Sequence, residues 1–278
     1  MTSNRGDPEI KEVILMKKVL CLVMAMLMLT ACLTACGKTD DAKTDMEYVK
    51  EKGTLIVGIT DFAPMDYQDE NGNWIGFDAD LAKAFAAKLG VEVKFQIIDW
   101  DNKAFELDGK AIDVVWNGMT ITDKVKAAMD CSNPYCNNQQ IVIVKKDVAD
   151  QYQTKESVKN LKFAVEDGSA GQEQVEALGA DFIPVADQTA ALLEVKAGTA
   201  DAAVIDSLMA GAMVGEGTGF ADLMYTVGLN DEQYGVGFRK GSDLVAELNQ
   251  FFKDYYASGE MMKLAQKYGV QASVIEQK

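Results

Sequence analysis

Short β-rich segments alternate with helical ones through most of this chain, and this order limits its fold more than any other feature. The first segment, GTLIVGIT (53–60), precedes DADLAKAFAAKLG (78–90), which predicts a helix with Asp78 as N-cap and Gly90 at its end. VEVKFQII (91–98) then alternates apolar and polar residues, as a strand does. We therefore predict an α/β protein whose sheets have largely parallel strands.

The later segments follow the same order. The predicted strands are IDVVW (112–116), QIVIVKK (140–146), LKFAVE (161–166), FIPV (182–185) and DAAVI (201–205). Helices are predicted near 123–129, from about Ser169, within TAALLEVKAG (189–198), and over the two C-terminal segments SDLVAELNQFFKDYYASG and EMMKLAQKYG.

One internal sequence similarity indicates two related lobes. FELDGKAIDVV (105–115) aligns without gaps with LEVKAGTADAA (193–203), and each reads as a helix end, a turn and a buried strand. Asn117-Gly118 follows the first strand, and Ile205-Asp206 follows the second. Ligands of open α/β sheets bind beyond the carboxyl ends of strands. Two such lobes facing each other would place 117–120 and Asp206 on opposite walls of one cleft.

The composition excludes several classes of function. The 278 residues carry 43 acidic and 27 basic side chains, so the net charge of −16 disfavours binding to nucleic-acid phosphates. Histidine is absent, which rules out Ser-His-Asp and Cys-His catalysis and His-ligated metal sites. No cofactor and no metal site are predicted.

A lipoprotein signal begins at Met16. Two lysines precede an apolar run (19–35) that ends in Leu-Thr-Ala-Cys-Gly, which resembles a bacterial lipobox with Cys36 as the acylated residue. Cys32 also fits the pattern, but a polar stretch follows Cys36. A transmembrane anchor is the alternative, although the run is slightly short for one. Several acyl chains on one cysteine would anchor the protein stably.

The segments around this signal complete the N-terminal organisation. Residues 1–15 fit no signal-peptide pattern, and we expect translation to begin at Met16. Residues 1–36 are then leader and signal peptide, and 37–46 form a polar tether. Outside the cytosol, the remaining Cys131 and Cys136 either form a disulfide or stay as buried thiols.

From about Thr54 to Tyr268 the chain resembles the bacterial extracellular solute-binding proteins of the polar amino-acid type (family 3). The resemblance rests on GFDADLAKAFAAKLG (76–90), DGKAIDVVWNGMTITDKVKAAMDCSNPY (108–135) and VGFRKGSDL (236–244), in the same order and spacing. Ala79 is smaller than the aliphatic residue usual there. Members of this family deliver ligands to ABC importers.

The resemblance implies the two-lobe fold of periplasmic binding proteins, with two hinge strands near 139–145 and 232–238 that bend to close on the ligand. Lobe 1 would comprise 46–139 plus 235–278, and lobe 2 would comprise 140–234.

The resemblance also implies a binding site on lobe 1. Asp61 would face the side chain or ammonium group of the ligand, and Phe62 and Trp100 would supply flat apolar walls. Their other interpretation is that both aromatic side chains are core. Asn117, Gly118 and Thr120 match the strand-end positions that receive the ammonium and carboxylate groups.

On lobe 2, Ser169, Ala170 and Gly171 match a helix start whose N–H groups bind the carboxylate. Asp206 matches the acid that pairs with the α-ammonium group, in a bond that contributes roughly 1.5–3 kcal/mol. It could also cap the helix that follows.

The pattern fails at Val125, where family members usually carry an arginine that binds the α-carboxylate. Three alternatives follow: Lys124 or Lys126 reaches the ligand, the helix start at 169–171 and Thr120 suffice, or the ligand has no free α-carboxylate. Lys124 is one position away from Val125, a rotation of about 100° around a helix.

The leading hypothesis is a lipid-anchored, monomeric and non-catalytic binding protein on the outer face of the cytoplasmic membrane. It would bind glutamine, a basic amino acid or cystine and dock to ABC permease and ATPase subunits. The alternatives are a ligand sensor that docks to a receptor, and a dehydratase-like enzyme on the same scaffold, which would need the missing arginine.

Overall fold

The structure, a computed structural model, describes residues 43–278. The predicted signal peptide, the acylated Cys36, the start at Met16 and most of the tether therefore lie outside the described residues. Between residues 43 and 278, no helix combines the length and the apolar character that a membrane crossing requires.

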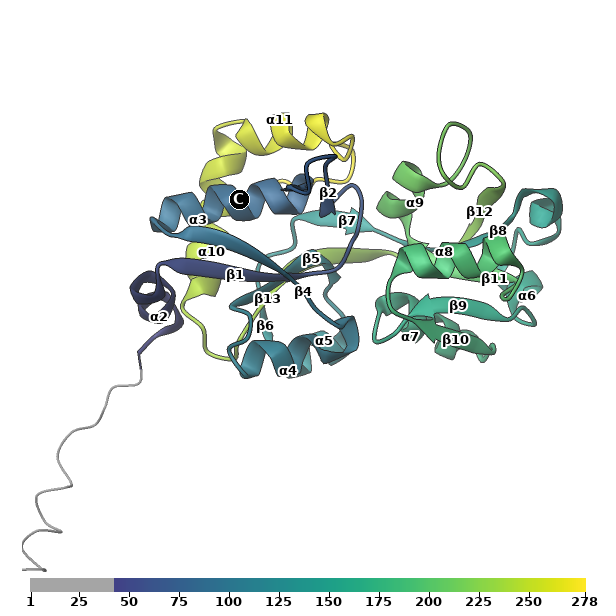
Figure 1. Ribbon diagram of the computed structural model, residues 1–278, viewed down its shortest axis with the longest axis horizontal. Helices are drawn as coiled ribbons and strands as arrows, with labels where there is room; N and C mark the ends of the chain where they lie inside the picture. Colours follow the sequence, from purple (N-terminus) through teal and green to yellow (C-terminus); the bar gives the residue numbers. More distant parts are fainter. Residues whose placement is uncertain (1–42) are drawn as a thin grey trace, which may run out of the picture. The chain divides into compact units, whose positions relative to one another are not determined.

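Lobe 1 is the part of the chain built on a six-stranded mixed sheet with the order β4-β1-β5-β13-β6, in which β7 also pairs with β13 (Figure 1). Its strands are β1 (Thr54–Ile59), β4 (Glu92–Ile97), β5 (Val114–Thr120), β6 (Asp130–Cys131), β7 (Cys136–Asn138) and β13 (Glu232–Phe238). β1, β4 and β5 are parallel, whereas β13 runs antiparallel to β5. A separate hairpin joins β2 (Tyr67–Gln68) to β3 (Trp74–Ile75).

Lobe 2 is built on a five-stranded sheet with the order β10-β9-β11-β8-β12. Its strands are β8 (Gln140–Lys145), β9 (Phe163–Glu166), β10 (Phe182–Val185), β11 (Ala202–Asp206) and β12 (Leu223–Gly228). β9, β10 and β11 are parallel, and β8 runs antiparallel to β11 and β12. Both sheets are therefore mixed. In lobe 1 the antiparallel strand beside β5 is β13, and in lobe 2 the antiparallel strand beside β11 is β8.

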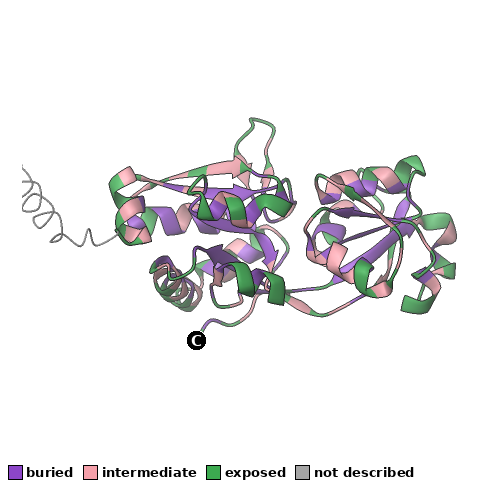
Figure 2. Cartoon of the chain, turned by 90° about the horizontal axis from the view of Figure 1, so that it is seen from below, coloured by how far each residue is buried: buried purple, intermediate pink, exposed green. Residues whose placement is uncertain are grey.

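Helices cover both faces of each sheet. Lobe 1 carries α2 (Asp45–Lys52), α3 (Phe77–Leu89), η1 (Trp100–Asn102), α4 (Lys103–Asp108), α5 (Asp123–Ala128), α10 (Leu244–Ala257) and α11 (Glu260–Lys267). Lobe 2 carries η2 (Lys146–Gln151), α6 (Lys155–Val158), α7 (Ala170–Leu178), α8 (Gln188–Ala197) and α9 (Ser207–Met213). In β11, Ala203 and Ile205 share a core with α8, while Ala202 and Val204 pack with α7. The strands are consequently buried on both sides (Figure 2).

The chain passes between the sheets twice. The first crossover is Gln139, between β7 and β8, and the second is residues 229–231, between β12 and β13. Both lie within or beside the segments expected as hinges. The predicted two-lobe α/β architecture is confirmed.

The two similar sequence segments, 105–115 and 193–203, also form a structural repeat. Asp113 and Asp201 each precede a central strand, β5 in lobe 1 and β11 in lobe 2. The Asp113 carboxylate accepts the N–H of Ile56, and the Asp201 carboxylate accepts the N–H of Lys162. The N–H groups of the two aspartates donate to the carbonyls of the same two residues. Each acid therefore joins the start of its strand to the neighbouring parallel strand in the same way.

The prediction that Asp78 caps a helix is wrong. The N-cap of α3 is Gly76, and Asp78 lies inside the first turn, completely buried. Its carboxylate accepts the N–H of Gly118 (2.7 Å) and the hydroxyl of Tyr135 (2.6 Å). Asp78 thus fixes the end of β5 instead of the start of its own helix.

Cys131 and Cys136 are free thiols in the structure. Cys131 pairs with Gly237 and Cys136 with Tyr234, so the two cysteines lie at different positions along β13. Of the two arrangements considered, the structure has the unbonded one.

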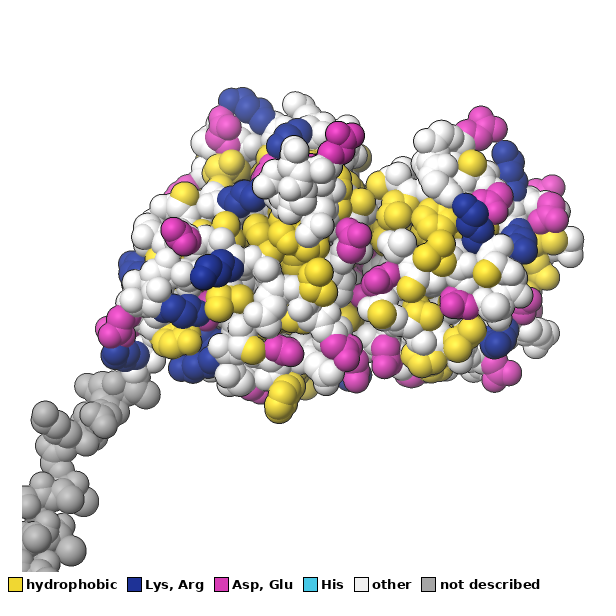
Figure 3. Space-filling model, in the orientation of Figure 1, with side chains coloured by type: hydrophobic (Ala, Val, Ile, Leu, Met, Phe, Trp, Pro, Cys, Tyr) yellow, Lys and Arg dark blue, Asp and Glu magenta, His cyan; other side chains and the backbone are white. Residues whose placement is uncertain are grey.

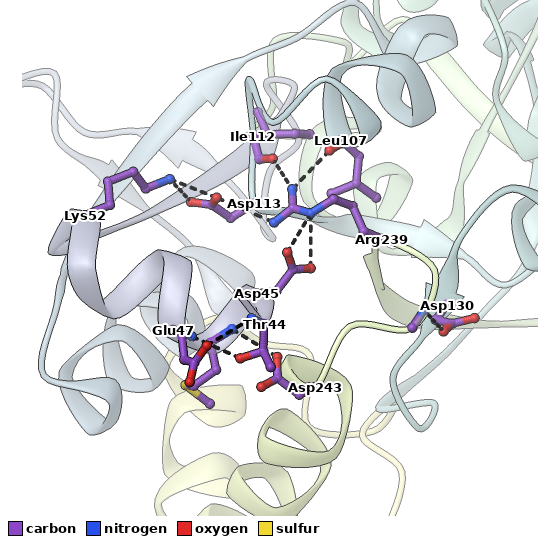
Figure 4. Close-up of polar contacts among 12 residues, drawn as sticks. Thr44, Asp45, Glu47, Lys52, Leu107, Ile112, Asp113, Asp130, Arg239 and Asp243 are labelled. Atoms are coloured by element: carbon purple, nitrogen blue, oxygen red, sulfur yellow. Dashed lines mark hydrogen bonds and ion pairs between the residues drawn. The ribbon is translucent and has the colours of Figure 1, made fainter. Parts of the chain in front are cut away.

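A buried arginine joins the first described helix to lobe 1 (Figure 4). Arg239 Nε donates to both carboxylate oxygens of Asp45 (2.9 and 3.0 Å), and Nη1 donates to the carbonyls of Leu107 and Ile112. Asp113 lies 3.8 Å from Nη2 and also accepts the ammonium group of Lys52. A planar guanidinium suits this many simultaneous contacts, which a lysine could not make.

We therefore predict that Arg239→Met lowers the free energy of unfolding by about 3–5 kcal/mol, because Asp45 and two buried carbonyls lose their donor. Urea unfolding of residues 43–278 would measure the loss. Lys240→Met is the matched control, since Lys240 is half exposed and should cost less than about 1 kcal/mol. Equal losses in the two variants would contradict the prediction.

Candidate functional site

A cavity lies between the lobes and contains about 690 Å³ of space not filled by atoms, including the part open to solvent. Nine of the eleven residues predicted to bind ligand line it: Phe62, Trp100, Asn117, Gly118, Thr120, Lys124, Ser169, Ala170 and Asp206. The strand-end argument thus brings most of the predicted set together.

Asp61 and Gly171 do not line this cavity. Asp61 is exposed and borders a different interlobe hollow, together with Asp99, Asp167 and Asp187. Burial and the nearby charge of Asp187 raise the pKa of Asp61 above its usual value. Gly171 is buried at the start of α7, where an added Cβ would lie 3.0 Å from Gln140 Oε1. Gly171 therefore allows the helix to approach β8.

Asn117 and Gly118 use their predicted binding groups inside lobe 1. The Asn117 side chain accepts from the N–H and hydroxyl of Thr60 and donates to the Thr60 carbonyl and the Asp66 carboxylate. The N–H of Gly118 donates to Asp78. A Cβ at Gly118, whose φ is 53°, would lie 2.4 Å from the Phe62 ring. Gly118 therefore leaves the room that the Phe62 ring occupies at the cavity wall.

Thr120 is tied to the second crossover. Its hydroxyl donates to Glu232 Oε1 (2.7 Å), which also accepts from Asn138 and Gln140 (2.6 and 2.8 Å). The donor of the Thr120 hydroxyl is therefore occupied by Glu232, and only its oxygen remains to accept from a ligand. Thr120 joins the wall of the cavity to the segments that connect the lobes.

The lobe 1 wall is mainly apolar at the position where the family arginine would stand. Val125 is buried with Trp100, Met119 and Met129 in one apolar cluster, because it lies on the inner face of α5. Thr122 caps α5 by accepting the N–H of Val125. Lys126 pairs with Asp123 (2.7 Å) and does not line the cavity, whereas the exposed Lys124 does.

The lobe 2 wall contains the start of α7. Ser169 is its N-cap, and its hydroxyl oxygen accepts the N–H of Gln172 (3.1 Å). By helix geometry the N–H groups of Ala170 and Gly171 have no intrahelical acceptor. Because Ala170 lines the cavity, its N–H is available to an anionic group there.

Asp206 ends β11 and is 4% exposed. Its Oδ1 accepts from the Tyr234 hydroxyl (2.6 Å), Gln140 Nε2 (3.0 Å) and Asn138 Nδ2, and its Oδ2 accepts from Gln188 Nε2. Asp206 is also the N-cap residue of α9, as its other interpretation expected, but its side chain makes no capping hydrogen bond there. Burial and the neighbouring Glu232 raise the pKa of Asp206 to about 7, against the opposing effect of these donors.

Glu166 was not predicted as a site residue, although it ends the parallel strand β9 just as Asp206 ends β11. It is 3% exposed, lines the cavity, and its Oε1 has no hydrogen-bond partner in the described part of the chain. Burial and the charge of Asp206 raise the pKa of Glu166 to about 8. The rule that identified Asp206 would have found Glu166 too.

Lys103 was also missed. It begins α4, is 8% exposed, and lines the cavity beside Trp100. Its ammonium group donates to the carbonyls of Trp100 (3.0 Å) and, across the lobes, Gly168 (2.9 Å). Lys103 lies four residues before the buried Leu107, on the inner face of α4, and this spacing was the available signal.

Two further acids, Asp101 and Glu173, line the cavity. Despite this number of carboxylates, residues 43–278 contain no group of three or more cysteine or acidic side chains arranged to hold a metal ion.

Glu166 makes stability depend on pH in a predictable direction. Its pKa of about 8 in the folded protein exceeds the ordinary glutamate pKa of 4.5, so folding favours the protonated form. This contribution to stability is present below about pH 4.5 and is lost as the pH rises through about 8. Glu166→Gln, which cannot ionise, should match wild type near pH 5 and exceed its free energy of unfolding near pH 9, by roughly 4 kcal/mol.

Urea unfolding without ligand at both pH values measures this difference. Glu176→Gln on the exposed face of α7 is the control and should behave like wild type at both. A Glu166→Gln protein no more stable than wild type near pH 9 would contradict the assigned pKa.

Comparison with known proteins agrees with this geometry. Residues 55–271 match the model of the bacterial extracellular solute-binding proteins, family 3. L-cystine-binding protein TcyJ of Escherichia coli (strain K12) is 30% identical over 226 residues, covering 79% of this chain and 84% of TcyJ. Arginine-binding extracellular protein ArtP of Bacillus subtilis (strain 168) is 31% identical over 262 residues, covering 91% of this chain and 98% of ArtP.

A solved structure of a mutant of ArgBP from T. maritima superposes with a TM-score of 0.76 at 37% identity, covering 81% of this chain and 98% of that one. TcyJ and ArtP are named as binding proteins, which agrees with the expectation of a protein without catalytic activity. The chain belongs to the bacterial extracellular solute-binding proteins of family 3.

Proposed function

We propose that this protein captures a polar amino acid in the interlobe cavity and delivers it to the permease and ATPase subunits of an ABC importer. The observation that carries the proposal is Asp206, a buried carboxylate at a strand end that opens into the cavity. Within residues 43–278, its Oδ2 accepts one hydrogen bond, from Gln188, and can accept the α-ammonium group as well. The ligand's charge would then offset the cost of burying the carboxylate.

The remaining groups of the cavity suit the rest of an amino acid. The N–H of Ala170 at the start of α7 would take part in binding the α-carboxylate. Phe62 and Trp100 would pack on the ligand's side chain. The relatives TcyJ and ArtP are named for L-cystine and arginine, and this supports both compounds as candidate ligands.

Closing of the lobes around the ligand would occur at Gln139 and residues 229–231. Contacts between the lobes already include Lys103 with the Gly168 carbonyl and Thr122 with Glu173 (3.3 Å). Both contacts lie beside the cavity, so opening for ligand entry would break them. Such hinge closure is the usual mechanism in two-lobe binding proteins.

We predict that Asp206→Asn weakens binding of the cognate amino acid by about 100-fold, because an ammonium group buried without a carboxylate costs several kcal/mol. Thermal shifts with the twenty amino acids, ornithine and cystine would identify the ligand, and calorimetry would then compare the variants. Asp167→Asn is the control, since Asp167 is exposed and lies outside the cavity. A wild-type protein that binds none of these compounds would overturn the proposed function.

The proposed location is the outer face of the cytoplasmic membrane, where acyl chains on Cys36 would anchor the protein. We predict that cells fed a radiolabelled fatty acid label the wild-type protein and Cys32→Ser, but not Cys36→Ser. Labelling of Cys36→Ser would show that another residue carries the acyl chains. Labelling of none of the three proteins would exclude the lipid anchor.

A further inference from the structure

The loop at 120–126 places no buried cation in the cavity. Val125 belongs to an apolar cluster, Lys126 is paired with Asp123 outside, and Lys124 is exposed at the rim. An α-carboxylate bound in the cavity would therefore have only N–H groups near it, unless another side chain supplies a positive charge. Lys103 is the one further basic side chain among the described residues that line the cavity.

The surroundings of Lys103 leave its charge without an ion pair. Its ammonium group donates to two carbonyls and lies 4.7 Å from the centre of the Trp100 ring. An ammonium group has three donors, so one remains. No carboxylate within residues 43–278 approaches it within 4.0 Å, although a buried charge without a partner is costly. Lysine is rarely buried without a carboxylate partner, so the lack of an ion pair at Lys103 is unusual.

The charged groups around Lys103 come from four elements. Asp101 lies on η1, Lys124 on α5, Glu166 at the end of β9, and Glu173 on α7. Burial is the largest effect, and it lowers the pKa of Lys103 to about 8, while the three acids act in the opposite direction. A ligand carboxylate beside the ammonium group would reverse the effect of burial.

Lys103 lies beside the start of α7, the second anion-binding feature of the cavity. Its ammonium group contacts the carbonyl of Gly168, which lies two residues before Ala170. The N–H of Ala170 begins the nine-residue helix α7. One anionic group at this place would meet both a cation from lobe 1 and a helix start from lobe 2.

We propose that Lys103 binds the α-carboxylate of the ligand together with the N–H of Ala170, in place of the arginine that is absent at Val125. This inference rests on the proposed function and makes a free carboxylate a requirement for tight binding. Because Lys103 also bonds the Gly168 carbonyl on the opposite lobe, the same ammonium group links carboxylate recognition to closure.

The test compares amino acids with their amides. Calorimetry would measure L-arginine against L-argininamide and L-cystine against its bis-amide, with wild type and Lys103→Met. Wild type should prefer the acid by about 30-fold or more, as expected for a buried charge pair. In Lys103→Met the acid should lose about that factor while the amide changes by less than about 3-fold, so that the preference disappears.

Lys126→Met, outside the cavity, is the matched control and should keep the preference for the acid, whereas Lys124→Met tests the other lysine that lines the cavity. If Lys103→Met keeps it, or Lys124→Met abolishes it, the inference is overturned. A merely structural role of Lys103 would weaken acid and amide equally, which the ratio between them reveals.

A measurement on wild type covers the case in which Lys103→Met does not fold. Titration of isotope-labelled lysine by NMR should show the pKa of Lys103 rising above about 8 when L-arginine or L-cystine saturates the protein. An unchanged pKa would overturn the inference.

The two proposals fail in different ways. Wild type that binds acid and amide equally overturns the role of Lys103 and leaves amino-acid capture intact. Wild type that binds neither acid overturns the inference, and the wider amino-acid panel then decides whether the proposed function fails as well.

Discussion

Two neighbouring carboxylates, the buried Asp206 and the half-buried Glu232, share the donors that connect the lobes. Asn138 and Gln140 flank the first crossover and each donate to both acids. Tyr234 of β13 adds a bond to Asp206. The connection between lobes is thus made of the same hydrogen bonds that orient the proposed ammonium-binding carboxylate. A change in the charge of Asp206 would act directly on the segments where the lobes bend.

The acidic surface and the cavity have different electrostatic consequences. Figure 3 shows acidic side chains on both lobes of the face in view, where water screens them. Inside the cavity, Glu166 and Asp206 are almost fully buried, and Lys103 faces them from lobe 1. Burial makes each of these charges costly, and a zwitterion would offset both signs at once. The surface charge alone therefore did not indicate which ligand the cavity accepts.

The sequence was sufficient to predict the fold because strands and helices have distinct periodicities, and because the carboxyl ends of parallel strands meet at one edge of a sheet. The predicted strands 91–98 and 182–185 and the helix start near Ser169 all occur. Asp78 was misassigned because a local pattern of acid before helix does not reveal a distant partner such as Gly118. Its burial follows from packing between segments forty residues apart, which periodicity does not contain.

The same limit explains the site. Strand ends locate Asn117 and Thr120 on the cavity wall, but only the folded chain shows that Thr60 and Glu232 occupy their polar groups. Lysine on a short helix is usually solvated, so the sequence offered no reason to predict Lys103 as a binding residue. What distinguishes it is the carbonyl of Gly168, sixty-five residues away on the other lobe. A residue whose role is made by closure between two lobes becomes recognisable only when both lobes are in place.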